Sequence, residues 1–338
     1  MYINRYMCSC LLCLVLFAAG CGSGGDRALR PEAVEIVRFD RELAEAFGSE
    51  SAAQEAAFAE RYGAFVRLYC EGVLNLSPAD SGYPVSGLRR FFSAPPVKRL
   101  YEDTERQFAD LRDTERGLGL LFGEIARQFP EAERPLIYSH VSGMNQSYVV
   151  TDSVISIALD NFLGADYPGY GDVFYDYQRL TKTPDYIVPG VALVWLYDRF
   201  PYREPNGPEM LLDRMIYEGK ILYAAERLLP ETPTAYILGY SPVQAEWLSK
   251  NERIIWDRML RQQDLFSTDG LTRNKYIAPA PFTAPLTLEA PGRAGRWTGW
   301  RIVSEYMRRH RDVSLLQLLT DSVTESREIL RLSKYNGN

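Results

Sequence analysis

Residues 208–229 read PEMLLDRMIYEGKILYAAERLL and combine a helical apolar pattern with one misplaced charge. At 3.6 residues per turn, the apolar residues share one helix face about 80° wide: Leu211, Met215, Leu222, Ala225 and Leu229. Glu218 falls on the same face, between Met215 and Leu222. A carboxylate taken out of water costs several kcal/mol unless it is paired, hydrogen-bonded or protonated. The pattern therefore predicts that Glu218 is an ion-pair member or a site residue.

The residues around Glu218 follow the frame of a zinc-peptidase helix without its ligands. In His-Glu-x-x-His, two histidines hold zinc and the glutamate is the general base. Here the frame reads Tyr217-Glu218-Gly219-Lys220-Ile221, and neither flanking position binds zinc well. The chain has only two histidines, His140 and His310, whereas a catalytic zinc normally takes three protein ligands. We expect no metal, no other cofactor and no catalytic residue.

The composition indicates a folded, acidic protein. Of its 338 residues, 46% are hydrophobic and 24% are charged, which is typical of one large globular domain or two closely joined ones. Without residues 1–20, which contain Arg5, 37 basic side chains face 44 acidic ones, a net charge of −7. A nucleic-acid partner requires a basic surface, so we expect none.

The N-terminus reads as an export signal. Arg5 precedes an apolar run over residues 11–17, and Ala18-Ala19-Gly20 precedes Cys21. The apolar run is shorter than the roughly 20 residues that span a bilayer. Residues 1–20 resemble a bacterial lipoprotein signal, with Ala18 where leucine is usual, and this resemblance implies that Cys21 carries the lipid. Residues 21–30 form a tether with one acidic residue, Asp26. Some outer-membrane lipoproteins carry an acidic run after the cysteine that sends them to the cell surface, and its absence here favours a periplasm-facing position.

Removal of the signal leaves few thiols. Cys70 is then the one cysteine besides Cys21, so no disulfide can form among the mature thiols. Cys70 lies in a helical apolar pattern, which predicts a buried structural thiol rather than a nucleophile.

The chain changes character near residue 134. Residues 31–133 are predicted to be mostly helical, with helices at 51–74, 97–111 and 113–129. Residues 134–338 contain a hairpin signal at 148–150 and 154–159, a further strand at 136–138, and helices at 187–200, 208–229, 242–263 and from 292 onward. A short strand at 34–39 and an extended connector at 279–291 complete the pattern. The predicted class is α+β, mostly helical with a small mixed sheet, in which both parts pack as one compact unit.

Glycines on the last large helix predict a close helix contact. Gly295 and Gly299 share a face with Ile302 and Tyr306, and each interior glycine costs about 1 kcal/mol relative to alanine. We expect a second helix to pack there backbone to backbone. Arg293 or Arg296 would then reach Glu218 and neutralise it.

Two loops are candidate binding elements. Asn145 and Gln146 precede the predicted hairpin and could bind a peptide backbone beside Tyr217 and Glu218, or could instead satisfy turn amides. The tyrosine-rich loop at 166–177 could be a partner surface or could simply pack.

Several segments together resemble the gliding motility lipoprotein GldB family. They are the lipobox, SGMNQS at 142–147 with the strands after it, MIYEGKILY at 215–223, LFST at 265–268 and PGRAGRWTGW at 291–300. The resemblance covers nearly all of the mature chain. It implies a lipoprotein anchored to the outer membrane through an acyl chain such as palmitate on Cys21. It also implies partners among the lipoproteins or envelope proteins of the motility and type IX secretion machinery.

The family in turn resembles zinc peptidases that carry histidines at the positions of Tyr217 and Ile221. This resemblance implies a degenerate, gluzincin-type architecture in which Glu218 is the relic of a general base. We interpret the chain as a non-catalytic assembly factor built on that fold. The alternatives are a residual metallopeptidase with carboxylate ligands, and a periplasmic lipoprotein that binds peptides or cell-wall fragments.

Overall fold

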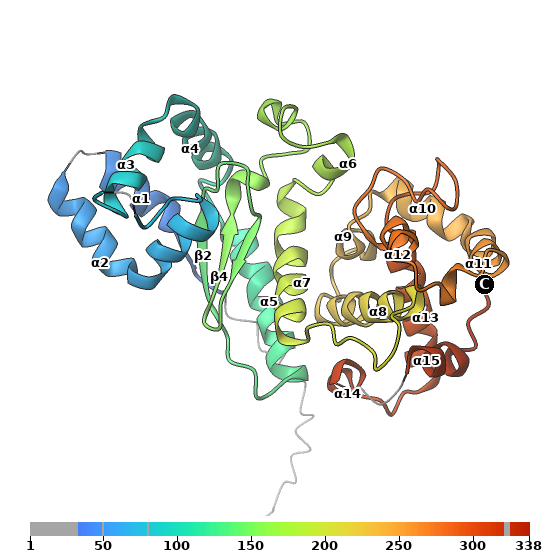
Figure 1. Ribbon diagram of the computed structural model, residues 1–338. Coiled ribbons are helices and arrows are strands. Elements are labelled where there is room, and N and C mark those ends of the chain that lie inside the picture. The colour runs from blue at the N-terminus through green and yellow to red at the C-terminus, as the bar shows by residue number, and fades with distance from the viewer. Residues whose placement is uncertain (1–32, 49–50, 80, 321–324) are drawn as a thin grey trace, which may run out of the picture. The chain divides into compact units, whose positions relative to one another are not determined.

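The computed structural model describes residues 33–48, 51–79, 81–320 and 325–338 (Figure 1). The predicted signal, the lipidation site Cys21 and the tether at 21–30 lie outside the described residues. All described residues belong to one compact unit that begins at Pro31. This unit is 60% helical and has a small mixed sheet of four strands, which confirms the predicted class. The zincin-like architecture remains a prediction.

The sheet has the strand order β1-β2-β4-β3. Its strands are β1 (Ile36–Val37), β2 (Leu136–His140), β3 (Tyr148–Val150) and β4 (Val154–Ala158). β2 runs parallel to both β1 and β4, whereas β3 pairs antiparallel with β4 in the register Tyr148↔Ile157. The predicted hairpin is therefore confirmed.

Both faces of the sheet are covered, as the alternation of side chains along each strand requires. On one face, Ile137, Ile155 and Ile157 join the core built with α5 (Arg112–Gln128) and α7 (Ile187–Arg199). On the other face, Tyr138 packs into a second apolar cluster. That cluster contains residues of α1 (Phe39–Gly48), α2 (Ala52–Leu68), the π-helix η1 (Tyr69–Val73), α3 (Val85–Ser93) and α4 (Pro95–Gln107).

Another helix, α8 (Leu211–Leu228), is packed on most sides by other helices. α8 contacts α7, α13 and several shorter helices, and its buried residues cover most of its circumference. Figure 1 shows α13 passing beside α8. The other helices are α6 (Asp176–Arg179), α9 (Thr234–Leu238), α10 (Pro242–Lys250), α11 (Glu252–Arg261), α12 (Gly270–Ile277), α13 (Ala294–Arg309), α14 (Leu315–Thr320) and α15 (Ser326–Ser333), with the 3-10 turn η5 (Asp264–Phe266).

Several predicted boundaries are wrong, and α1 and α3 were not predicted. The helix predicted at 242–263 is broken at Asn251, whose side-chain amide donates to the Trp247 carbonyl oxygen at 2.8 Å and so satisfies the end of α10. The helix predicted at 51–74 is α2, kinked at Gly63 where φ is 43°, continued by η1. The strand predicted at 34–39 is two residues long because Phe39 begins α1.

The predicted backbone contact joins α8 and α13. A Cβ atom on Gly299 would lie 1.8 Å from the Met215 carbonyl oxygen, and one on Gly219 would lie 2.3 Å from the Gly299 carbonyl oxygen. Neither atom can move aside, because both belong to the main chain of a helix. Glycine at these two positions is therefore required by the close approach.

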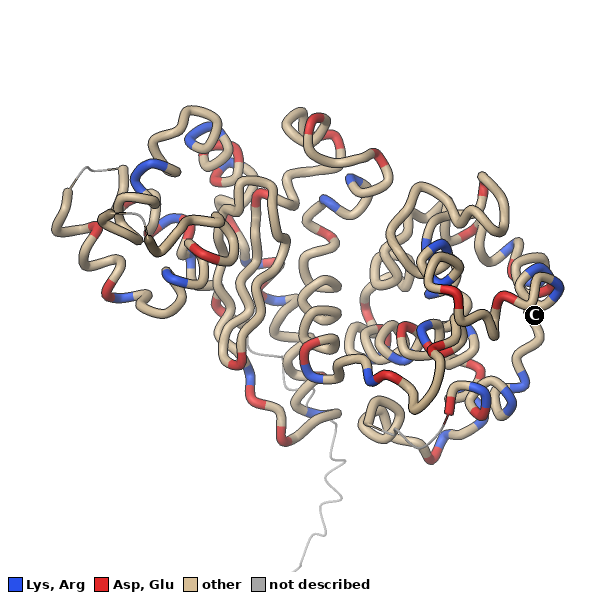
Figure 2. Tube along the Cα trace, in the orientation of Figure 1, with Lys and Arg blue, Asp and Glu red and all other residues tan. Residues whose placement is uncertain are grey.

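Acidic and basic residues are interspersed along the described chain (Figure 2). Many form exposed ion pairs three or four residues apart on one helix, such as Arg106 with Asp103 at 2.6 Å and Arg127 with Glu124 at 2.6 Å. Exposed pairs of this kind contribute about 0.2–0.5 kcal/mol each. The fold therefore depends on its apolar clusters and buried contacts rather than on these pairs.

We expect Gly299→Ala to destabilise the protein by roughly 3 kcal/mol, because the clash with α8 exceeds the gain of about 1 kcal/mol that alanine gives a helix interior. Denaturant unfolding followed by circular dichroism measures the change. Gly207→Ala is the matched control, since nothing lies within 4 Å of a Cβ atom there. Equal stability of the two variants would contradict the backbone contact.

Candidate functional site

Glu218 lies in a triad with Tyr197 and Arg296. The three residues come from α8, α7 and α13 respectively. Arg296 Nε donates to Glu218 Oε2 at 2.8 Å, and the Tyr197 hydroxyl donates to the same oxygen at 2.6 Å. Arg296 Nη2 also donates to the Tyr197 oxygen at 2.9 Å, which closes the ring of contacts. The predicted ion pair is confirmed, and its cation is Arg296.

The triad is largely withdrawn from water. The side chains of Arg296 and Glu218 are only 14% and 11% exposed. Burial alone would lower the pKa of Arg296, but Tyr197 and Glu218 together hold it above its ordinary value. Burial, with the negative charge of Glu218, raises the pKa of Tyr197, so this hydroxyl remains a donor. Each charge in the triad is therefore matched.

Arg293 lies next to the triad and does not contact Glu218. It is the N-cap of α13 in the left-handed conformation, with φ of 63°. Its Nη2 donates to the Gly239 carbonyl oxygen at 3.0 Å, and its guanidinium carbon lies 5.8 Å from the centre of the Tyr240 ring. Burial first, and then the charge of Arg296, lower the pKa of Arg293. Within the described chain, no carboxylate forms an ion pair with it.

The two positions that hold zinc ligands in the peptidase frame have packing roles. The Tyr217 hydroxyl donates to the Phe200 carbonyl oxygen at 3.1 Å, and its ring lies 5.0 Å from that of Tyr202. Burial raises the pKa of Tyr217 to about 12. Ile221 is fully buried in the core. In the described segments, no three His, Cys, Asp or Glu side chains gather closely enough to hold a metal ion.

Asn145 and Gln146 bind backbone carbonyls of η1 rather than joining the triad. Asn145 Nδ2 donates to the Val73 oxygen at 2.9 Å, and Gln146 Nε2 donates to the Gly72 oxygen at 3.0 Å. These bonds satisfy carbonyl groups at the end of η1, which continues α2. The structure shows them in that role, and a peptide-binding role for them remains a prediction.

A buried polar network beside this loop was not predicted. Asp160 accepts the backbone N–H groups of Ser142 and Met144 at 2.9 and 2.7 Å. Asn161 Nδ2 donates to Ser142 Oγ at 2.9 Å, and Lys182 Nζ donates to Asn161 Oδ1 at 2.7 Å. The signal in the sequence was an Asp-Asn pair directly after a buried strand, where a chain turn needs polar partners. The network fixes the loop at 142–147.

His140 and Cys70 are buried structural residues. His140 Nδ1 lies 2.7 Å from Ser156 Oγ, and burial lowers the pKa of His140 to about 3. Cys70 is fully buried, and burial raises the pKa of its thiol to about 12, which suppresses the reactive thiolate. The predicted structural thiol is confirmed.

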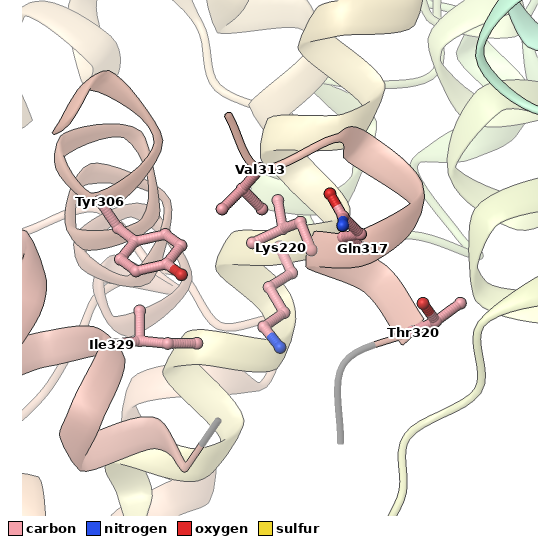
Figure 3. Close-up of a pocket in the computed structure, with 7 residues that line it drawn as sticks. Lys220, Tyr306, Val313, Gln317, Thr320 and Ile329 are labelled. Atoms are coloured by element: carbon pink, nitrogen blue, oxygen red, sulfur yellow. The ribbon is translucent and has the colours of Figure 1, made fainter. Parts of the chain in front are cut away.

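Two cavities lie away from Glu218. One of about 300 Å³ is lined by Lys220 of α8, Tyr306 of α13, Ile329 of α15, and residues of and just before α14 (Figure 3). Figure 3 shows Lys220 between Gln317 on one side and Tyr306 with Ile329 on the other. A second cavity of about 620 Å³ borders η5 and is lined in part by Phe266 and Thr268.

Comparison with known proteins gives one match. The model of the family described as gliding motility protein GldB matches residues 27–337, which is most of the chain. No curated protein and no solved structure matches the chain. Of the described helices, none has the length and apolar character needed to cross a membrane.

We expect Glu218→Gln to destabilise the protein by about 3–5 kcal/mol, because Arg296 would remain as an unpaired buried charge. Tyr197→Phe removes one neutral donor and should cost about 1–2 kcal/mol. Denaturant unfolding of Glu218→Gln, Arg296→Met and the double variant measures the coupling. A double variant that loses as much as the sum of the two single losses would show that the pair is not coupled.

His140 should make stability depend on pH. Its folded pKa of about 3 lies below the unfolded value of about 6.5, so the unfolded chain binds the proton first as the pH falls. This group therefore removes about 2 kcal/mol of stability between pH 7 and pH 5. The free energy of unfolding is measured at both pH values in His140→Asn and in the control His310→Asn. Between pH 7 and pH 5, the control should lose about 2 kcal/mol more than His140→Asn, which lacks the titrating group. Equal losses would contradict a neutral buried His140.

Proposed function

We propose, from the premise that the chain belongs to the gliding motility protein GldB family, that it is a non-catalytic lipoprotein that assembles or stabilises an envelope complex. Membership in this family implies a gliding-motility lipoprotein of the cell envelope. The finer parts of the proposal are anchoring to the outer membrane through a lipid on Cys21, a periplasm-facing position, a link to type IX secretion and descent from a zinc-peptidase fold.

The observation that carries the non-catalytic role is the buried ion pair that Glu218 forms through Oε2. A general base must present a lone pair to the proton that it removes. In this protein, Glu218 Oε2 accepts from both Arg296 and Tyr197, and the side chain is almost fully buried. The ion pair and the bond from Tyr197 direct Oε2 toward protein donors. A glutamate held in this way is suited to support the fold.

A stacked pair of tyrosines, one of them exposed, supports the assembly role. Tyr175 is 73% exposed and stacks on Tyr177 with ring centres 5.9 Å apart. Val173, close by in the same loop, is 51% exposed. Tyr170 anchors the loop from inside, because its buried hydroxyl donates to the Asp160 carbonyl oxygen at 2.7 Å. An exposed tyrosine stacked on a half-buried one, on an anchored loop, is well suited to bind a protein partner.

Replacing both Tyr175 and Tyr177 by serine should reduce partner recovery at least fivefold and impair gliding. The measurement is crosslinking and affinity purification of the full-length, lipidated protein from a gliding host, together with colony spreading. The variant should keep wild-type abundance and thermal midpoint because neither ring belongs to either apolar cluster. Leu288→Ser is the matched control, as Leu288 is 77% exposed elsewhere. Unchanged partner recovery would contradict this surface.

The peptidase alternative makes a different prediction. It requires about one equivalent of zinc in the purified wild-type protein and proteolysis that is lost in Glu218→Gln. We expect neither zinc above the level of an apo control protein nor cleavage of casein. One equivalent of zinc with Glu218-dependent cleavage would overturn the non-catalytic proposal.

A further inference from the structure

The region around the triad carries one more positive charge than negative charge. Arg293 and Arg296 are successive basic residues at the start of α13, and among the described residues only Glu218 forms an ion pair with either of them. The pair of Arg296 with Glu218 is internally matched. The positive charge of Arg293 is not balanced by an ion pair with any described residue.

Arg293 has donor groups to spare. A guanidinium has five N–H groups in a planar fork, and Arg293 uses Nη2 for the Gly239 carbonyl oxygen. Its Nε and Nη1 have no hydrogen-bond acceptor in the described part of the chain. Gly239 leaves room for the fork, because a Cβ atom there would lie 3.2 Å from Nη2. The guanidinium is therefore fixed by one hydrogen bond through Nη2, and Nε and Nη1 have no acceptor among the described residues.

The surroundings offset the charge of Arg293 only in part. Arg293 caps the N-terminal end of α13, where the helix dipole is positive. Burial and then the charge of Arg296 lower the pKa of Arg293, and Glu218 raises it by less. Asp185 lies near enough to influence Tyr186, as Arg293 does, but Asp185 is exposed and forms no ion pair with Arg293.

We propose that Arg293, with Arg296 behind it, binds the free carboxylate of a peptide ligand. A planar carboxylate matches the guanidinium fork and accepts two parallel hydrogen bonds. Its single negative charge equals the single excess positive charge, whereas a phosphate dianion would leave a net negative charge in a largely buried site. The carboxylate site stands on the charges described above, and its assignment to a partner peptide rests on the proposed assembly function.

Isothermal titration of the full-length protein in detergent tests this site. The probes are N-acetyl-dialanine with a free carboxyl group, the same dipeptide as its amide, and inorganic phosphate. We expect saturable binding of the free acid, at least tenfold weaker binding of the amide, and weaker binding of phosphate than of the free acid. Equal affinity for acid and amide would overturn the proposal, and tighter binding of phosphate would overturn the choice of a carboxylate.

Two variants separate a binding role from a structural one. Arg293→Asn removes the guanidinium but tolerates the left-handed backbone, and it should weaken free-acid binding at least tenfold. Arg301→Gln is the matched control, because Arg301 is paired with Glu252 at 2.8 Å and should leave affinity unchanged. Unchanged affinity in Arg293→Asn would overturn the proposal.

Two further readouts keep the test decisive. If Arg293→Asn does not fold, the wild-type thermal midpoint is compared in sodium acetate and in sodium chloride of equal ionic strength. A larger rise in acetate supports the site, and no difference overturns it. Weaker peptide binding with full partner recovery in crosslinking would support the carboxylate site while removing only its link to assembly.

Discussion

The close approach of α8 and α13 is the constraint on which the rest of the site depends. Gly219 and Gly299 have no side chains, so the two helix backbones come into direct contact. Glu218 precedes one of these glycines, and Arg296 lies one turn before the other. The contact therefore places a carboxylate and a guanidinium together where little water reaches. Their pairing follows, because either charge alone would be costly in that position.

The buried triad differs in kind from the many ion pairs on the surface. An exposed pair can be lost with little effect, since water and salt replace the partner. The triad has no such replacement, and Tyr197 satisfies a further bonding position of both charged groups. This arrangement fixes the position of α13 relative to α7 and α8, which come much earlier in the sequence. Within the described chain, the neighbouring Arg293 forms no ion pair with a carboxylate.

A second buried polar network lies just after the ends of β2 and β4. Asp160 and Asn161 hold the loop that leads into β3, and the same loop reaches η1 through Asn145 and Gln146. The N-terminal helices are thus attached to the sheet by hydrogen bonds as well as by apolar packing. The tyrosine-rich loop is fixed to the same network through Tyr170, which explains how one loop can both pack and present exposed rings.

The sequence by itself determined the elements whose signals are local. The hairpin, the Glu218 helix, the glycine contact and the ion pair with one of two arginines all followed from periodicity and from the cost of buried charge or interior glycine. Only the tertiary structure chose Arg296 over Arg293, because that choice depends on how the left-handed turn at Arg293 directs its side chain toward Gly239. Likewise, the break at Asn251 and the Asp160 network depend on partners brought together by folding, since such hydrogen bonds leave no periodic trace in the sequence.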